Sequence, residues 1–199
     1  TCVAPDYVFV QERVFAQFIE EMKGAIRRFY GEDARLSPDY GRIVNGRHTE
    51  RLCALLREDG ASVVYGGETD KAERFIAPTL LCPPDPDGAA CMREEIFGPL
   101  LPVFPYARIE EALAFINARE KPLALYVFSE DKRAAEEILR RTSSGGACIN
   151  DTVSHIIDPH LPFGGVGESG TGSYHGEYGF ANFTHARSVL ARSTRVCLR

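Results

Sequence analysis

The stretch Leu100–Asn150, LLPVFPYARIEEALAFINAREKPLALYVFSEDKRAAEEILRRTSSGGACIN, alternates two kinds of pattern. Three short runs in it are rich in β-branched and aromatic residues, as buried strands are. Between them, apolar residues recur every three or four positions, as they do on one face of a helix. Strands that alternate with helices of this length are typical of a mostly parallel sheet covered on both faces. The stretch therefore predicts an α/β fold with a mostly parallel, twisted sheet and flanking helices.

The same alternation extends toward the N-terminus. The run "DYVFV" (6–10) predicts a buried strand, and the period of the apolar residues after it predicts a helix of about 18 residues. A proline-rich segment further on leads into "MREEIFGP" (92–99), which predicts a short helical turn ended by Gly98 and Pro99. Between these two regions we expect a helix at 48–58 and strands at 61–67 and 74–81.

The rhythm breaks after Asn150. Residues 150–182 are rich in glycine and proline and have no stable period, before "THARSVLAR" (184–192) resumes a strand-like alternation. A structureless loop of about 30 residues is rare inside a compact domain unless it is functional. Loops held by a rigid sheet are also where binding and catalytic residues concentrate. We therefore expect the functional site to draw on this loop.

Composition and charge exclude several function classes. The chain has 199 residues, of which 44% are hydrophobic and 26% charged, as in one soluble domain of ordinary size. A net charge of -5 without a Lys/Arg cluster gives no reason to expect nucleic-acid binding. No apolar run approaches the roughly 20 residues of a membrane span. The six cysteines contain no C-x-x-C pair, which argues against a metal site and favours a reducing, cytoplasmic environment.

The segment "GVGESG" (165–170) matches the G-x-G-x-x-G pattern of dinucleotide-binding proteins letter for letter. That fingerprint needs a strand before it, a helix after it and an acidic residue about 20 positions later. Here Pro162 and Phe163 precede the glycines, and "TGSYHGEYGF" after them predicts no helix. We interpret the match as accidental, so any Rossmann domain would lie outside this chain.

Three stretches together carry a family resemblance. "TCVAPDY" (1–7), "REEIFGPLLPV" (93–103) and "LPFGGVGESGTGSYHG" (161–176) occur in this order, with strand–helix spacers between them. The chain closely resembles, over its whole length, the C-terminal part of the NAD(P)-dependent aldehyde dehydrogenases, and most of all their class 3 branch. The resemblance implies a partial catalytic domain at 1–183 and a C-terminal oligomerisation strand and tail at 184–199. Both ends look cut, and the N-terminal Rossmann cofactor domain is expected to be absent.

The resemblance also implies the chemistry and the residues that perform it. Cys2 matches the nucleophile, whose thiolate adds to an aldehyde and, after hydride transfer to NAD or NADP, leaves a thioester for water to hydrolyse. Glu95 and Phe97 match the pair that contacts the ribose and the nicotinamide of the cofactor. Taken alone, Cys2 would more often be a structural thiol, Glu95 a solvated carboxylate and Phe97 a core residue.

A substrate channel is implied in the glycine-rich loop. Phe163 matches an aromatic residue that walls the channel, which suits an aliphatic or aromatic aldehyde, although an anchor for the loop is an equally good interpretation. Val153, Ile156 and Ile157 fall where the family lines its tunnel. The remaining histidines suggest no metal set, and we interpret them as loop residues: His155, His160 and His175.

Several alternatives stay open at this point. The general base belongs upstream of Thr1 in this family, so the 199-residue chain alone is expected to oxidise no aldehyde. The resemblance implies a homodimer through 184–192, and a non-catalytic dimerisation product would share that strand. A Cys/His acyl hydrolase would pair Cys2 with a histidine, and a semialdehyde-specific branch would need a cation that 152–163 does not offer. A tail beyond the chain would allow membrane association of an otherwise cytoplasmic protein.

Overall fold

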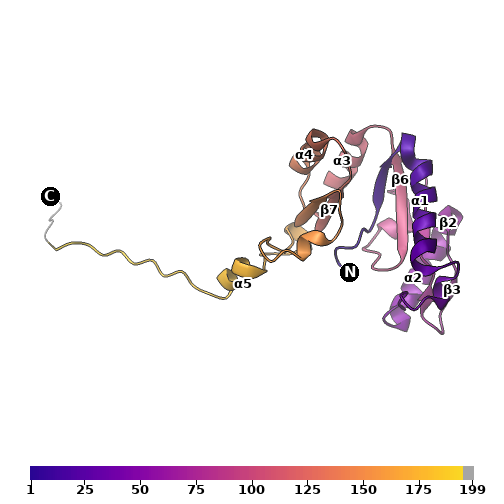
Figure 1. Ribbon diagram of the computed structural model, residues 1–199, viewed down its shortest axis with the longest axis horizontal. Coiled ribbons are helices and arrows are strands. Elements are labelled where there is room, and N and C mark those ends of the chain that lie inside the picture. Colours follow the sequence, from indigo (N-terminus) through magenta and orange to yellow (C-terminus); the bar gives the residue numbers. More distant parts are fainter. Residues whose placement is uncertain (195–199) are drawn as a thin grey trace.

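The computed structural model describes residues 1–194. Figure 1 shows a body of strands and helices that holds the N-terminus, a smaller layer with α3, α4 and β7, and an extended C-terminal segment that leads away from both. The body and the layer are built around separate sheets. The predicted α/β class, with a mostly parallel sheet and flanking helices, is confirmed.

The main sheet has four strands in the order β1-β6-β5-β2. They are β1 (Val8–Gln11), β6 (Leu100–Tyr106), β5 (Thr79–Leu81) and β2 (Val63–Tyr65). Both β1 and β5 run parallel to β6, whereas β2 is antiparallel to β5 at the outer edge. Since β6 has a strand on either side, it forms the centre of this sheet.

A second sheet consists of β7 (Ala124–Val127) and β8 (Gly146–Ile149), which are parallel and pair from the first residue of each. The antiparallel pair β3 (Thr69–Asp70) and β4 (Phe75–Ile76) forms a small third sheet. The strand predicted at 74–81 is thus two strands, β4 and β5. The break falls at Pro78, which has no N–H to give to a ladder.

The helices follow the apolar periods closely. They are α1 (Glu12–Tyr30), α2 (Gly46–Glu58), α3 (Ile109–Asn117), α4 (Lys132–Arg141) and α5 (Gly176–Asn182). The side chain of Asp131 accepts hydrogen bonds from the first turn of α4, as the sequence predicts for an N-cap. The short helix α5 corrects the expectation that no helix follows the glycine motif. It begins at Gly176, several residues beyond the motif.

The helical turn predicted at 92–99 lies earlier, at the 3-10 helix η3 (Ala90–Met92). The buried carboxylate of Asp59 accepts hydrogen bonds from the backbone N–H groups of Ala90 and Cys91, at 2.9 and 2.8 Å. This long-range cap fixes the turn at its first residues, and residues 93–99 form an irregular loop instead. The other 3-10 helices are η1 (Ala34–Leu36), η2 (Gly60–Ser62), η4 (Ser154–Ile156) and η5 (Gly167–Ser169).

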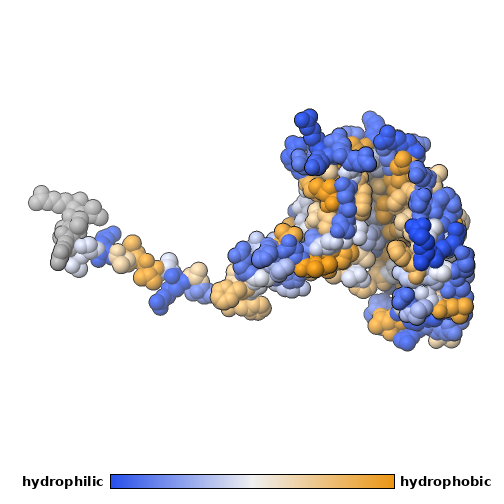
Figure 2. Space-filling model, in the orientation of Figure 1, coloured by the Kyte–Doolittle hydropathy of each residue, from blue (hydrophilic) through white to orange (hydrophobic). Residues whose placement is uncertain are grey.

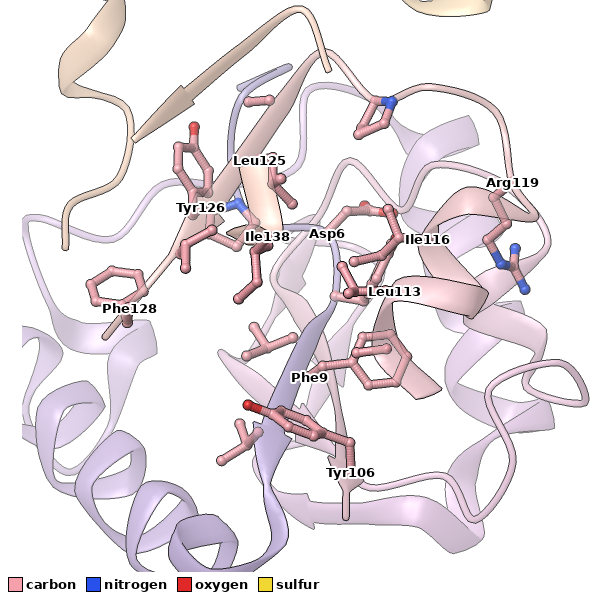
Figure 3. Close-up of a pocket in the computed structure, with 18 of the residues that line it drawn as sticks. Asp6, Phe9, Tyr106, Leu113, Ile116, Arg119, Leu125, Tyr126, Phe128 and Ile138 are labelled. Carbon is pink, nitrogen blue, oxygen red and sulfur yellow. The ribbon is translucent and has the colours of Figure 1, made fainter. Parts of the chain in front are cut away.

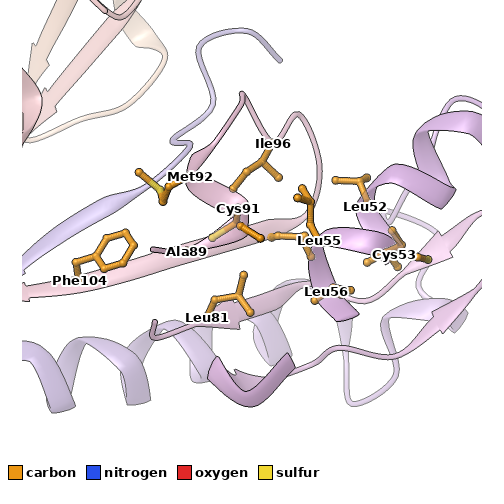
Figure 4. Close-up of a cluster of buried hydrophobic side chains, with 13 residues drawn as sticks. Leu52, Cys53, Leu55, Leu56, Leu81, Ala89, Cys91, Met92, Ile96 and Phe104 are labelled. Carbon is orange, nitrogen blue, oxygen red and sulfur yellow. The ribbon is translucent and has the colours of Figure 1, made fainter. Parts of the chain in front are cut away.

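The principal hydrophobic core lies between α2, η3 and the main sheet (Figure 4). Leu52 and Leu55 from α2 meet Ile96 of the irregular loop and Phe104 of β6 there. Cys53 is buried in the same cluster, where it serves as a small apolar residue. The core therefore holds the 93–99 loop firmly against α2.

The C-terminal segment leads away from the folded body (Figure 1). Residues 184–192 form no strand in the described chain, since no strand within 1–194 lies beside them to complete a ladder. Val189 and Leu190 are largely exposed there. Residues 195–199, the end of the predicted tail, lie outside the described residues. Within 1–194, none of the helices has both the length and the apolar character to cross a membrane.

Candidate active site

A cleft of about 1850 Å³ lies between β1 of the main sheet and β7 of the second sheet. Figure 2 shows the hollow between the two parts of the molecule, with apolar residues inside it. Cys2, Glu95, Thr152 and Glu168 are among the residues that line the cleft. It thus brings together three regions that the sequence analysis singled out: the N-terminal segment, the 93–99 loop and the glycine-rich loop.

Cys2 is exposed on a tight turn. The N–H of Ala4 donates to the carbonyl of Thr1 at 3.0 Å and closes that turn. Val3 follows Cys2 and is only 1% exposed. Its carbonyl accepts a hydrogen bond of 2.6 Å from the hydroxyl of Tyr126 in β7. The turn is therefore anchored immediately after the cysteine, while the thiol stays open to solvent.

Tyr126 joins this turn to the glycine-rich loop. Burial raises the pKa of Tyr126, and a backbone hydrogen bond from Val153 partly offsets that rise. The thiols of Cys148 and Cys2 lie near enough to raise the pKa slightly further. The hydroxyl therefore keeps its proton at neutral pH and remains a donor to the Val3 carbonyl. No sequence pattern pointed to this residue.

Replacing Tyr126 by phenylalanine tests this anchor. The buried carbonyl of Val3 would lose its donor, so we expect the free energy of unfolding to fall by about 1–3 kcal/mol. Urea unfolding of the two proteins measures the difference. Tyr106→Phe is the matched control, because Tyr106 also lines the cleft and its loss of hydroxyl should cost less than about 0.5 kcal/mol. Equal losses in the two variants would contradict the anchor.

The segment after Cys2 is tied to the loop that carries Glu95. The carboxylate of Asp6 accepts a hydrogen bond of 2.9 Å from the N–H of Ile96. Burial raises the pKa of Asp6; the hydrogen bond to Ile96 opposes this, and the nearby charge of Glu95 adds to it. One hydrogen bond thus connects the two regions that the sequence analysis assigned to the nucleophile and to the cofactor.

Arg51 of α2 holds the same loop from the other side. Its guanidinium donates to the carboxylate of Glu94 at 2.8 Å, to the carbonyl of Glu95 at 3.3 Å and to the carbonyl of Ile96. Two of these acceptors are backbone carbonyls. Arg51 therefore fixes the path of the loop, in addition to pairing with the charge of Glu94. It is another residue that no local pattern could indicate.

Glu95 and Phe97 flank the buried Ile96 and are both exposed, Phe97 by 58%. Ile96 is thus turned into the core, while the side chains on either side of it face solvent. Phe97 has a φ of 48°, which is uncommon outside glycine and often marks a functional position. A Cβ at Gly98 would lie 2.6 Å from the methyl groups of Leu52, so a larger residue there would require the buried Leu52 side chain to shift.

Aromatic rings continue from Tyr126 into the glycine-rich loop. The ring centroids of Tyr126 and His155 are 6.0 Å apart, and those of His155 and Phe163 are 6.4 Å apart. Phe163 stacks on His175 at 5.6 Å, and its backbone exchanges two hydrogen bonds with Tyr174. Phe163 therefore anchors the loop through its contacts, and the row of rings extends toward the turn that bears Cys2.

The other residues predicted for the tunnel are spread out. Val153 is half-buried and contacts Tyr126 through its backbone, with a φ of 66°. Ile156 is half-buried at the end of η4. Ile157 is 76% exposed. Of these three residues, only Val153 is connected directly to the surroundings of Cys2.

His155 is buried, although the sequence analysis placed it among loop residues. Its Nδ1 lies 3.2 Å from the sulfur of Cys148, and burial lowers its pKa, so the ring is neutral at physiological pH. The cysteine that this histidine contacts is Cys148 and not Cys2. Within residues 1–194, the arrangement gives the acyl-hydrolase alternative no support.

Close backbone packing explains the glycines of the loop. A Cβ at Gly164 would lie 2.0 Å from the carbonyl oxygen of Gly172, and one at Gly165 would lie 2.1 Å from that of Ser169. The segment 165–170 contains the 3-10 helix η5 and does not lead from a strand into a helix. The interpretation of "GVGESG" as an accidental match is therefore consistent with the structure. No group of His, Cys, Asp or Glu within 1–194 is placed to hold a metal ion.

An α/β domain with a large cleft that collects side chains from distant parts of the sequence is typical of an enzyme domain. The chain belongs to the aldehyde dehydrogenase family, because the model of that family matches residues 1–189. The resemblance to the class 3 branch is also confirmed: the rat "Aldehyde dehydrogenase family 3 member A2" is 47% identical over 195 residues, which are 98% of this chain and 40% of that protein.

Two further relatives show the extent of the match. A Staphylococcus aureus protein, "4,4'-diaponeurosporen-aldehyde dehydrogenase", is 50% identical over 196 residues, 98% of this chain and 42% of that protein. A bovine protein, "Aldehyde dehydrogenase, dimeric NADP-preferring", is 50% identical over 192 residues, 96% of this chain and 79% of that sequence. The chain spans 42% of the length of the Staphylococcus relative.

A solved structure agrees with the fold. The substrate-bound Staphylococcus aureus AldH superimposes with a TM-score of 0.95 at 49% identity, covering 100% of this chain and 43% of that protein. A succinate-semialdehyde dehydrogenase from Burkholderia pseudomallei superimposes with a TM-score of 0.81 at 29% identity, covering 92% of this chain and 38% of that protein.

Proposed function

We propose that this chain supplies the nucleophile and part of the cofactor site of an NAD(P)-dependent aldehyde dehydrogenase. The enzyme would oxidise aliphatic or aromatic aldehydes to carboxylic acids. The observation that carries the proposal is the hydrogen bond of 2.9 Å between Asp6 and the N–H of Ile96. It joins the segment of Cys2 to the loop of Glu95, and both of these residues line one cleft.

Cys2 would perform the covalent step. Its thiolate adds to the aldehyde carbon, and the resulting C–S bond gives a thiohemiacetal. The bound NAD(P)+ supplies the acceptor for the hydride that this carbon loses when it becomes a thioester. Water then breaks the C–S bond, releasing the carboxylic acid and returning the thiolate. The backbone N–H of Cys2 is this chain's own candidate donor to the oxyanion.

Glu95 and Phe97 fit a nucleotide cofactor by their chemistry. A carboxylate can accept hydrogen bonds from both hydroxyls of a ribose, and an exposed aromatic ring can pack beside a nicotinamide. Both side chains are exposed on a loop that Arg51 and Asp6 hold in place. The Rossmann domain and the general base would lie outside residues 1–199, so this chain alone is expected to be inactive. The family relationship is compatible with NAD or NADP.

Glu95→Gln in the complete protein tests this assignment. The amide is a weaker acceptor than the carboxylate, so we expect the KM for NAD(P)+ to rise about tenfold or more while the KM for the aldehyde stays nearly constant. Aldehyde-dependent reduction of NAD+ and of NADP+ is measured by absorbance. Glu94→Gln is the neighbouring control, with an expected change below about threefold. Equal kinetics in both variants would reject the role of Glu95, and no reduction by the wild type would reject the function.

The aldehyde site is proposed along the glycine-rich loop. Its apolar walls would come from Phe163, Val153, Ile156 and Ile157. Phe163 belongs to the row of rings that extends toward the Cys2 turn. The loop at 152–163 contains no Lys or Arg to hold a second carboxylate, which favours apolar aldehydes over semialdehydes. The Staphylococcus relative is named a 4,4'-diaponeurosporen-aldehyde dehydrogenase, so the name gives an aldehyde as the substrate of that protein.

Assembly and location complete the proposal. Residues 184–192 would form a strand against a partner subunit in a homodimer, and a segment that extends away from the folded body is suited to such pairing. The bovine relative is named a dimeric enzyme. Among the described residues, Cys2, Cys53, Cys82, Cys91 and Cys148 are free thiols, which favours the reducing cytoplasm.

A further inference from the structure

His155 is the buried residue of the segment that carries three of the proposed aldehyde-site residues. It is 8% exposed, whereas Val153 and Ile156 are half-buried and Ile157 is 76% exposed. Its ring therefore points into the fold from η4, while its neighbours stay accessible. A buried imidazole loses its hydration, which the contacts around it have to offset. His155 is thus the residue through which the fold holds this segment.

The start of β8 leaves room for the His155 ring. A Cβ at Gly146 would lie 2.7 Å from Cδ2 of His155 and 3.0 Å from its Nε2. The preceding Gly145 leaves room for a second part of the glycine-rich loop, because a Cβ there would lie 2.2 Å from the carbonyl oxygen of Gly164. Two separate segments of the loop therefore pack on these two glycines, one of them through the ring of His155.

Three further side chains surround the ring. Nδ1 of His155 lies 3.2 Å from the sulfur of Cys148 in β8. The ring centroid is 6.0 Å from that of Tyr126 and 6.4 Å from that of Phe163. Figure 3 shows Tyr126 on β7 among the residues that line the cleft. One imidazole thus connects both strands of the second sheet with Phe163 of the loop.

The His155 ring is suited to packing and not to carrying charge. Burial lowers the pKa of His155, so the ring is neutral at physiological pH. Within residues 1–194, its Nε2 is buried without a hydrogen-bond partner. A proton on this ring would therefore be a buried charge without compensation, which is costly.

The place of His155 within its segment has a consequence for the substrate. Val153 precedes it and contacts Tyr126 through its backbone, next to the turn that carries the nucleophile. Ile156 and Ile157 follow it and lead away from that contact. A short aldehyde at the nucleophile would reach only the Val153 end of the segment, whereas a long chain would extend past the two isoleucines.

We propose that His155 is a positioning residue of the aldehyde site, which holds Ile156 and Ile157 in place beyond Val153 and thereby supports the binding of aldehydes with long apolar chains. The proposal rests on the proposed function, because it takes these residues as walls of the aldehyde site. The ring of His155 contacts no reacting atom and acts through the residues on either side of it. Gly146 takes part, since only a residue without a Cβ leaves the ring its space.

His155→Ala in the complete protein removes the ring. We expect kcat/KM for decanal to fall about tenfold, because a displaced segment loses apolar contacts with the long chain, whereas kcat/KM for propanal should change less than about twofold. His155→Leu fills a similar space without charge and should keep both values within about threefold of the wild type. His160→Ala is the control, because His160 is exposed on the same loop and its loss should change neither value.

Gly146→Ala tests the same contact without altering the histidine. Its Cβ would take the place of the His155 ring, so kcat/KM for decanal should again fall at least about fivefold more than that for propanal. The thermal midpoint of each variant verifies that it is folded. Equal losses for the two aldehydes in folded His155→Ala or Gly146→Ala would overturn the proposal. So would a folded His155→Leu that is inactive toward both aldehydes, because the imidazole nitrogens would then have a role of their own.

Amide hydrogen exchange in the wild-type complete protein needs neither a variant nor an aldehyde. If His155 holds its segment, exchange at 154–157 should be at least about tenfold slower than at the exposed residues 158–161. Equal exchange in the two segments would overturn the positioning role by itself. If the wild type reduced no NAD(P)+ with any aldehyde, the proposed function would fail; slow exchange at 154–157 would then leave His155 as a support of the loop alone, without a role in an aldehyde site.

Discussion

Cys2→Ala is expected to lower the rate of aldehyde oxidation by the complete protein at least about 1000-fold. Alanine has no atom that can bond to the carbonyl carbon, so neither the thiohemiacetal nor the thioester can form. The turn itself should persist, because its hydrogen bonds come from the backbone of Thr1, Val3 and Ala4 and from the Tyr126 hydroxyl. Aldehyde-dependent formation of NAD(P)H measures the loss, and the thermal midpoint verifies that the variant is folded.

A second cysteine near the cleft provides the control for this variant. Cys148 is half-buried and its sulfur lies 3.2 Å from His155, so it is the thiol with a histidine partner. Cys148→Ala should retain most of the activity if Cys2 is the nucleophile. If Cys148→Ala were inactive and Cys2→Ala active, Cys148 would be the nucleophile instead. The Cys/His acyl-hydrolase alternative would then be favoured.

Arg51→Met is expected to lower the free energy of unfolding by about 2–4 kcal/mol and to raise the KM for NAD(P)+ about tenfold. Methionine keeps the apolar stem but removes the donors to the carbonyls of Glu95 and Ile96. The Ile96 carbonyl would remain buried without that donor, and the loop with Glu95 and Phe97 would lose its fixed path. Urea unfolding and steady-state kinetics measure the two effects.

Arg57→Met on the same helix is the matched control. Arg57 is exposed and pairs with Glu50 at 3.6 Å on the surface, so its loss should cost less than about 0.5 kcal/mol and leave the KM unchanged. If Arg51→Met behaved like Arg57→Met, the 93–99 loop would not depend on the hydrogen bonds from Arg51. A loss of stability without a change in KM would show that these hydrogen bonds stabilise the fold but do not affect cofactor binding.

The sequence predicted the regular elements well because their signals are local. Apolar periods indicated α1 to α4, and short β-branched runs indicated β6, β7 and β8. The failures depend on long-range contacts: Asp59 moved the helical turn to η3 by capping it from 31 positions away. The strand expected at 184–192 stays a prediction, because it would pair with a partner subunit.

The residues of the candidate site also divide into those with a local sequence signal and those that act through long-range contacts. Cys2, Glu95 and Phe163 could be named because their surrounding motifs resemble those of a family. Asp6, Arg51 and Tyr126 could not, because each acts on a backbone atom of a segment far away in the sequence. Their residue types are common and their spacing to the acceptor follows no period. Only the folded chain reveals that they hold the Cys2 turn and the Glu95 loop.

Covalent labelling of Cys2 tests the central claim most directly. The complete protein is treated with a chloroketone analogue of an aldehyde substrate, whose chloride the reactive sulfur displaces, and peptide masses then locate the label among the six cysteines. We predict one label per chain on Cys2, with activity lost in proportion to labelling and protection by the aldehyde. Full activity in protein whose Cys2 is completely labelled would contradict the account.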